Sequence, residues 1–548
     1  MALDSGKLSR LGTGLLLLVC TLYFLLFYGH VSKDKTQSYI IPLTHSAASE
    51  YLKQHKIVVS HQLPIIQSVA AELTAQQYQD LIQLSVELFP NASVQSSGIA
   101  WGQRIGFSPA TASQVTGAGQ LHAAGILGSG VTVAVLDSGF KSINGLRHDA
   151  YGRNRVYGTY DAIRNKVVMN DSDDSGHGTH VTSVVANSER DAYGRFYGLA
   201  PNVRLMNVKA FTQAGAGNYA DVIRGIQWLV QYRELFNIKV LNLSFSATPR
   251  SYYWQDPLNR AVMAAWQSGI TVVTSAGNQG PDPMTIGVPG NNPYVITVGA
   301  VSDNSTDTNN NDDFLANFSS AGPTHERFIK PEVVALGSRL MGVMESNTHI
   351  ASEHPEYHDG GKYFMMSGTS QSAAVVSGIA ALMLSDDSSL TPDNVKCRLM
   401  ATAQAAKKST GELAYSVFQQ GAGQVNAFEA VQNRLNGCAN VGLNIAQDLN
   451  GSQHFSGKAM RAQNGDYYIR AAESLLWNGL LDRSGRFAWQ DATTWQDATT
   501  WQDATTWQDA TTWQDATIWQ DATTWQDATI WQDLNQVFIA INAWVTEE

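Results

Sequence analysis

The stretch FMMSGTSQSAAVVSG (residues 364–378) decides how the rest of the chain is interpreted. Small residues form a predicted turn that runs directly into an apolar helix, and Ser370 stands at the helix start. The free N–H groups and the dipole of a helix N-terminus favour negative charge. A serine nucleophile needs such surroundings, because its attack on a carbonyl creates an oxyanion. Taken alone, however, the stretch favours the commoner interpretation, a serine that only caps a helix.

Two further stretches change that balance. The apolar run VTVAVLDSG (131–139) predicts a buried parallel strand, with Asp137 at its carboxyl end, where open α/β sheets carry their active sites. The stretch DDSGHGTHV (173–181) places His177 between two glycines at the start of another helix. Singly, such an aspartate or histidine is usually structural. Together with Ser370, in the chain order Asp, His, Ser, they form a catalytic-triad pattern.

These stretches resemble the motifs of the subtilisin-like serine peptidases, the subtilases, and the resemblance covers about residues 115–435. Further segments carry it: SAGNQG (275–280), NFSSAGP (317–323) and KPE (330–332). The resemblance implies that Ser370 attacks the scissile carbonyl and that His177 accepts and returns the proton. It also implies that Asp137 orients the imidazole and that Asn278 donates its amide to the oxyanion, together with the backbone N–H of Ser370.

The predicted fold class is α/β, a doubly wound and mostly parallel sheet. Strands are expected at 203–208, 238–244 and 270–275, and they alternate with helices at 219–236 and 257–268. Such repeated αβ units place a parallel sheet between two layers of helices.

Substrate contacts are implied by the same resemblance. The edge that pairs with an extended substrate would contain Gly215 and Gly217, and such pairing gives affinity with little sequence selectivity. The walls of the P1 pocket would be Ser244, Phe245, Ser246, Ser275, Ala276 and Gly277. The family usually has glycine in place of Ser246 and a smaller or straighter residue in place of Phe245, which leaves the pocket size open. These walls carry no acidic residue, so the P1 residue is expected to be uncharged.

The sequence departs from the usual family pattern at one more position, shortly after Ser370. Ala374 stands where the family usually has proline. Alanine continues a helix more readily than proline, so a slight change of helix geometry is expected, with the chemistry retained.

The first 35 residues predict export. Residues 11–29 carry no charge and are strongly apolar, and Lys7 and Arg10 precede them. This pattern is typical of a signal peptide or of an uncleaved signal anchor. The protein is therefore expected outside the cytoplasm, either secreted or attached to the membrane through this segment.

Residues 36–94 predict a small α+β domain with the element order βαββαβ, a ferredoxin-like arrangement. In this position it resembles the inhibitory propeptide of subtilases; the alternative is an unrelated N-terminal domain. The resemblance implies cleavage between about residues 90 and 115. Residues 95–114 would be a linker, and 115–440 the peptidase domain.

The composition changes after residue 440. Residues 441–488 form a linker or a small module, and 535–548 a C-terminal tail. Between them, 489–534 repeat the hexapeptide WQDATT, in places WQDATI. In an extended chain an even period places every tryptophan on one face, whereas a helix would scatter them. Three interpretations stay open: a small β-repeat, a surface- or glycan-binding tail, and a poorly ordered tract.

Charge and composition limit the possible partners and cofactors. The net charge is −11 and no long basic run occurs, which argues against nucleic acid. Residues 302–313 are rich in oxygen ligands but lack EF-hand spacing, which favours a solvated loop. Structural calcium, common among subtilases, is possible without an assigned ligand, and catalysis is expected to need no cofactor. Cys397 and Cys438 are either bridged or separately buried.

Two classes of function remain. The first is an exported serine endopeptidase that acts on proteins or peptides and matures by propeptide cleavage. The second is a catalytically inactive subtilase scaffold that binds surfaces through its tryptophan-rich tail. A serine esterase of the α/β-hydrolase type does not fit, because the motif order differs and no Gly-x-Ser-x-Gly elbow is present.

Overall fold

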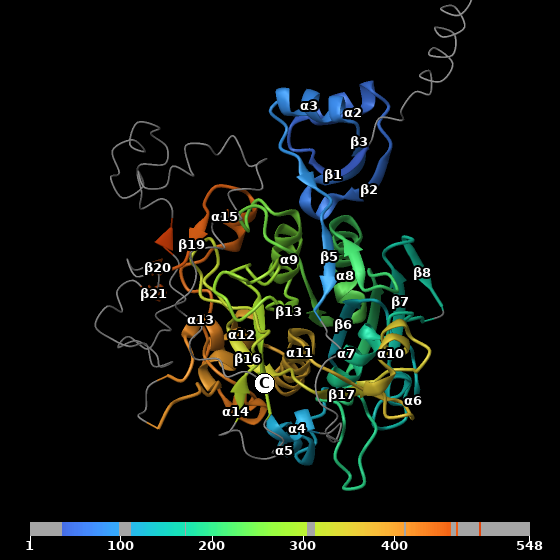
Figure 1. Cartoon of the computed structure of the whole chain (residues 1–548), viewed down its shortest axis with the longest axis vertical. Coiled ribbons are helices and arrows are strands. Elements are labelled where there is room, and N and C mark those ends of the chain that lie inside the picture. The colour runs from blue at the N-terminus through green and yellow to red at the C-terminus, as the bar shows by residue number, and fades with distance from the viewer. Residues whose placement is uncertain are drawn as a thin grey trace, which may run out of the picture. The chain divides into compact units, whose positions relative to one another are not determined.

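The computed structural model describes residues 36–97, 111–169, 171–303, 313–409, 413–461, 467–469 and 493–494 (Figure 1). These residues fall into two compact units. The first contains 36–62 and 67–91, and the second contains 63–66 and the described residues from 92 onward. The predicted signal or anchor segment lies outside the described residues, as does the hexapeptide repeat except for 493–494. Among the described helices, none is long and apolar enough to cross a membrane.

The first unit is a four-stranded antiparallel sheet with two helices. Its elements are β1 (Gln37–Pro42), α2 (Ser46–Gln54), β2 (Val59–Leu63), β3 (Ser68–Leu73), α3 (Ala75–Gln83) and β4 (Phe89–Pro90). The strand order β2-β3-β1-β4 and the chain order βαββαβ are those of the predicted ferredoxin-like arrangement. A capping box begins α3, in which the Thr74 hydroxyl accepts from the Gln77 N–H at 3.2 Å.

The second unit is built on a nine-stranded sheet with the order β15-β14-β13-β11-β6-β9-β7-β8, and β16 also pairs with β14. Only the pairs β14–β15 and β7–β8 are antiparallel. The strands are β6 (Thr132–Asp137), β7 (Val156–Asp161), β8 (Lys166–Val168), β9 (Arg204–Lys209), β11 (Ile238–Leu243), β13 (Thr271–Ser275), β14 (Ile296–Ser302), β15 (Phe314–Leu315) and β16 (Val333–Leu336). Every residue of β6, β13 and β14 is buried, so both faces of the sheet are covered.

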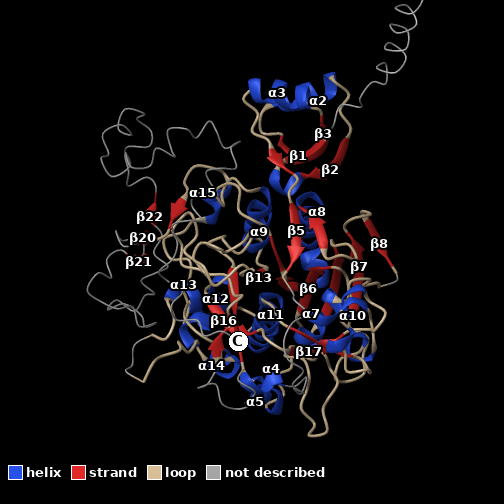
Figure 2. Ribbon diagram, viewed as in Figure 1, coloured by secondary structure: helices blue, strands red, loops and turns tan. Residues whose placement is uncertain are grey.

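Two pairs of longer helices pack on this sheet. Figure 2 shows these helices in blue beside the strands of the sheet in red. The first pair is α7 (His177–Ala186) and α11 (Thr369–Asp386), and the second is α8 (Tyr219–Phe236) and α9 (Pro257–Gln267). The predicted doubly wound, mostly parallel α/β fold is therefore confirmed. Helix α11 continues through Ala374 without a break and is buried from its first residue to Leu384, because it lies in the interior, packed against both the sheet and α7.

Shorter elements complete the described part of the second unit. The helices are α4 (Thr111–Val115), α5 (Ala118–Ala123), α6 (Asn144–Arg147), α10 (His349–Glu353), α12 (Pro392–Thr402), α13 (Val417–Gln420), α14 (Ala427–Gln432) and α15 (Ile445–Leu449). The 3₁₀ turns are η1 (Pro64–Ile66) and η3 (Pro355–Tyr357). The small sheets contain β5 (Ser93–Ser96), β10 (Ala216–Asn218), β12 (Phe245–Ser246), β17 (Leu340–Val343), β18 (Tyr363–Met366), β19 (Phe455–Ser456), β20 (Ala459–Arg461), β21 (Tyr467–Ile469) and β22 (Thr493–Thr494).

The segment after residue 440 packs on the same unit. Asp448 of α15 is fully buried, and its Oδ2 accepts from the hydroxyls of Tyr253 at 2.5 Å and Tyr294 at 3.0 Å. Its Oδ1 lies 2.7 Å from His454 Nδ1. Just before this segment, a disulfide joins Cys397 to Cys438. The packed body thus continues past the boundary predicted at 440, at least as far as the buried Phe455 and Ala459.

Candidate active site

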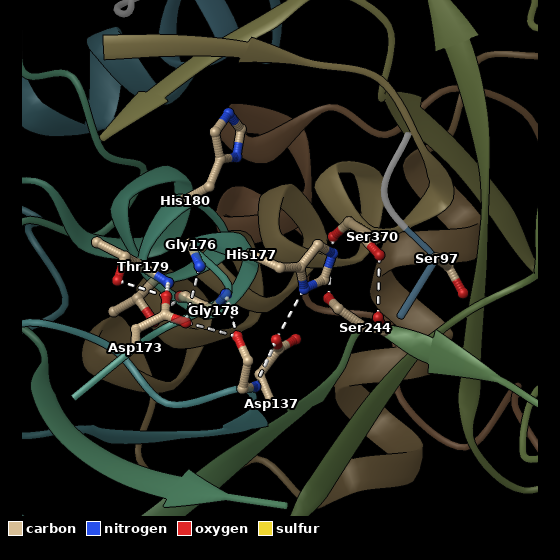
Figure 3. A network of polar contacts seen from close by, with 12 residues as sticks. Ser97, Asp137, Asp173, Gly176, His177, Gly178, Thr179, His180, Ser244 and Ser370 are labelled. Carbon is tan, nitrogen blue, oxygen red and sulfur yellow. Dashed lines mark hydrogen bonds and ion pairs between the residues drawn. The ribbon is translucent and has the colours of Figure 1, made fainter. Parts of the chain in front are cut away.

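Three buried side chains meet where β6 ends and α7 and α11 begin (Figure 3). Asp137 is the last residue of β6 and is 1% exposed. His177 is the first residue of α7, and its Nδ1 lies 2.7 Å from Asp137 Oδ1. Ser370 is the second residue of α11, on the other side of the imidazole. The structure therefore brings the three predicted triad residues together.

The backbone of this corner is close-packed. A Cβ added to Gly178 would lie 1.9 Å from the carbonyl oxygen of Gly139, so only glycine lets α7 approach the end of β6 so closely. That approach is what holds His177 beside Asp137.

Asp173 reinforces the same corner, a role that the sequence did not indicate although the residue lies in the DDSGHGTHV stretch. Its Oδ1 accepts from the Ser138 hydroxyl at 2.9 Å and the Gly176 N–H at 2.9 Å. Its Oδ2 accepts from the N–H of Thr179 at 2.8 Å and from the Thr179 hydroxyl at 2.6 Å. Burial raises the pKa of this carboxyl against the effect of these four hydrogen bonds. Asp173 thus ties the residue after Asp137 to both flanks of His177.

The hydroxyl of Ser370 has an alternative partner in this structure. It donates to the Ser244 carbonyl at 3.0 Å, while the Ser244 hydroxyl donates to the Ser370 carbonyl at 3.0 Å. The buried Nε2 of His177 has no hydrogen-bond partner. A rotation of the Ser370 side chain is therefore needed before its proton can pass to His177. Such loose nucleophile geometry is common before the reacting complex forms.

Asn278 is held in a fixed orientation beside Ser370. Its Oδ1 accepts from the Thr369 N–H at 3.0 Å and the Thr369 hydroxyl at 2.9 Å. These two bonds direct Nδ2 to the carbonyl oxygen of Ser97, which lies 2.5 Å away. The N–H of Ser370 points to the same oxygen at 3.5 Å. The two donors that the sequence predicts for an oxyanion therefore converge on one carbonyl.

That carbonyl belongs to an extended segment of the chain itself. Strand β5 lies between β10 and β12 and pairs antiparallel with both. The N–H of Ser96, the last residue of β5, donates to the Gly215 carbonyl at 3.1 Å, and the N–H of the next residue, Ser97, donates to the Ser244 carbonyl at 3.1 Å. The edge predicted to pair with substrate, which contains Gly215 and Gly217, is therefore occupied by residues 93–97, and the same segment also pairs with the predicted wall segment Ser244 to Ser246. No local feature of the sequence marks that segment.

Of the remaining predicted wall residues, Ser275 contacts Ser97, and the others are held by neighbouring parts of the chain. Ser275 Oγ lies 3.2 Å from Ser97 Oγ and 3.0 Å from the Phe245 carbonyl. The Phe245 ring is fully buried and packs on Phe211, with the ring centroids 5.1 Å apart. The backbone carbonyl of Ala276 accepts a hydrogen bond from the Gly287 N–H at 3.1 Å. Gly277, at φ 107°, donates its N–H to the Thr369 hydroxyl at 3.2 Å.

Metal ligands do not gather in the part of the chain that the structure describes. No group of three or more histidine, cysteine, aspartate or glutamate side chains could hold an ion there. Most of the oxygen-rich stretch, residues 304–312, falls outside that part, so structural calcium stays a prediction.

Comparisons with known proteins agree with this geometry. The model of the subtilase family matches residues 128–423. Serine protease AprX of Bacillus subtilis is 39% identical over 311 residues, which cover 56% of this chain and 67% of that protein. Subtilisin DY of Bacillus licheniformis is 32% identical over 58% of this chain and 96% of its own length. The crystal structure of fervidolysin from Fervidobacterium pennivorans, described as a keratinolytic enzyme related to subtilisin, matches in fold. Its TM-score is 0.58 and its identity 21%, over 80% of this chain and 68% of that one.

Proposed function

The chain belongs to the subtilase family and is a serine-type endopeptidase, and on that premise we propose that it works through Asp137, His177 and Ser370 after releasing its own N-terminal domain. Protein or peptide chains are its substrates, as the family implies. The observation that carries the proposal is the Ser97 carbonyl, which lies against both predicted oxyanion donors beside the nucleophile.

Each residue has a step in the proposed reaction. Ser370 Oγ leaves the Ser244 carbonyl, passes its proton to His177 Nε2 and attacks the scissile carbonyl. Asn278 Nδ2 and the Ser370 N–H stabilise the oxyanion, and they are already held in position before the reaction begins. Asp137 keeps the proton of the imidazole on Nδ1 and stabilises the cation that forms. The proton then leaves His177 for the departing amine, and water completes the hydrolysis.

The first substrate is the chain itself. With the Ser97 carbonyl on the oxyanion donors, the bond to be cleaved joins Ser97 to Gly98. This cleavage separates the ferredoxin-like unit, which we propose is an inhibitory propeptide, from the peptidase body. Export fits the disulfide between Cys397 and Cys438, because such bonds persist in oxidising compartments outside the cytoplasm.

The test begins with purified full-length protein. We expect the mature form to start at Gly98 by N-terminal sequencing and to be labelled by a fluorophosphonate probe at Ser370. An intact protein that neither matures nor labels would instead support the inactive scaffold. A labelled enzyme with a different N-terminus would refute only the assigned junction. Sequencing samples taken early in maturation excludes later trimming as the cause of such a difference.

The pH dependence of hydrolysis tests the role of His177. Burial acts to lower the pKa of His177, but the charge and hydrogen bond of Asp137, with the charge of Asp173, outweigh it and raise the pKa. A general base must be neutral, so activity should fall with decreasing pH, starting above the ordinary histidine pKa of about 6.5. The measurement is kcat/KM on a short peptide between about pH 5 and 9, with circular dichroism to check folding at each pH. Full activity at pH 5 in folded enzyme would contradict the assignment.

A further inference from the structure

The pocket that receives the side chain of Ser97 is lined by hydroxyl groups. Ser97 is 4% exposed, and its Oγ lies 3.4 Å from Ser246 Oγ and 3.2 Å from Ser275 Oγ. Ser275 Oγ also lies 3.0 Å from the Phe245 carbonyl, which gives its proton a second acceptor. Three hydroxyls therefore form one chain, from Ser246 through Ser97 to Ser275. A serine at this position therefore places one hydroxyl within hydrogen-bond distance of both Ser246 and Ser275.

Ser246 also limits the size of the pocket. A Cβ added to Gly287 would lie 2.8 Å from the Cβ of Ser246. A Cβ added to Gly277 would lie 3.4 Å from the Ser246 Oγ. The side chain of Ser246 therefore lies close to the Cβ position of each of these two glycines and fills space beside both. A long or aromatic P1 side chain would need that same space.

We propose that Ser246 makes this enzyme selective for serine and other residues no larger than serine at P1. This inference rests on the proposed function and specifies its substrate class. An oversized side chain in a close-packed site costs about 1–3 kcal/mol, equivalent to about 5–150-fold in rate. A P1 alanine lacks the hydroxyl that bonds to the pocket serines. This loss should lower kcat/KM by a smaller factor than an oversized side chain does, about 3–10-fold. The expected order of kcat/KM is therefore serine, then alanine, then leucine and phenylalanine.

The experiment uses mature enzyme, titrated with a fluorophosphonate probe, and chromogenic peptides that differ only at P1. Ser246→Gly should raise kcat/KM for phenylalanine and leucine about 10–100-fold and lower it several-fold for serine. The matched variant Ser246→Ala removes the hydroxyl but keeps the Cβ. It should lower kcat/KM for serine several-fold and leave the exclusion of phenylalanine in place.

A second measurement uses processing of the full-length chain. Ser97→Phe should slow the appearance of the mature form at least tenfold, and adding Ser246→Gly should restore it. Restoration also shows that the Ser97→Phe chain folds. A titrated wild-type enzyme that prefers phenylalanine, or a Ser246→Gly variant with unchanged preferences, would overturn the inference. Absence of labelling by the probe would instead refute the proposed function.

Discussion

Replacing Ser370 by alanine should abolish hydrolysis and leave residues up to Ser97 attached to the peptidase body. The expected loss in kcat is about 10⁶-fold, the size known for loss of the corresponding serine in subtilisin, because the variant lacks the hydroxyl that attacks the carbonyl held by Asn278 and the residue 370 N–H. The measurement combines kcat on a short chromogenic peptide with N-terminal sequencing of the purified variant.

A control for this substitution lies two residues further along the same helix. Ser372 is also fully buried, and its hydroxyl donates to the Ala335 carbonyl at 3.1 Å, away from the triad. Ser372→Ala removes one buried hydrogen bond and should keep activity and processing within a few-fold. If Ser370→Ala matured normally in isolation, another peptidase would be responsible for maturation; if it hydrolysed peptides, the nucleophile would be misassigned.

Replacing Asp137 by asparagine should lower kcat about 10⁴-fold. Asparagine has nearly the same shape, but its amide can donate a proton where the carboxylate only accepts. If the amide turns its N–H₂ toward His177, Nδ1 becomes an acceptor and the imidazole proton moves to Nε2. Nε2 can then no longer accept the Ser370 proton. The measurement is kcat in active-site-titrated protein, with thermal unfolding to confirm that the variant folds.

The matched control is the neighbouring carboxylate Asp174. Its side chain is 62% exposed and its ion-pair partner is Lys209, at 3.2 Å. Asp174→Asn should leave kcat nearly unchanged. An Asp137→Asn enzyme within tenfold of wild type would show that Asp137 does not set the tautomer of His177.

The sequence predicted those parts of the site that local patterns determine. Asp137 ends a continuous apolar strand, so its position at the carboxyl edge of a parallel sheet could be inferred. His177 and Ser370 each follow small residues, so their positions at helix starts could be inferred as well. The orientation of the Ser370 hydroxyl toward Ser244 could not, because it depends on a single side-chain torsion.

Other features depend on partners far away in the chain. Ser97 meets Asn278, 181 residues later, and nothing in its own surroundings indicates that contact. Asp448 meets Tyr253 across 195 residues, and local sequence patterns give no sign of that contact. The apolar run Ile57 to Val59 suggests that the second strand of the N-terminal unit begins there, but the strand begins only at Val59. Residues 55–57 instead form hydrogen bonds back to the end of α2, and Lys56 has a φ of 52°.

The disulfide between Cys397 and Cys438 has a consequence for an enzyme surrounded by active copies of itself. It encloses the chain between α12 and the residues that follow α14. A nick by another copy inside this loop leaves both fragments covalently joined, and α14 packed against α11 and α12. Autolysis inside this loop would therefore leave α11, the helix that carries Ser370, in contact with α14. The cleaved protein would migrate as one band on a denaturing gel until the disulfide is reduced. Autolytic cleavage between Cys397 and Cys438 therefore need not inactivate the enzyme.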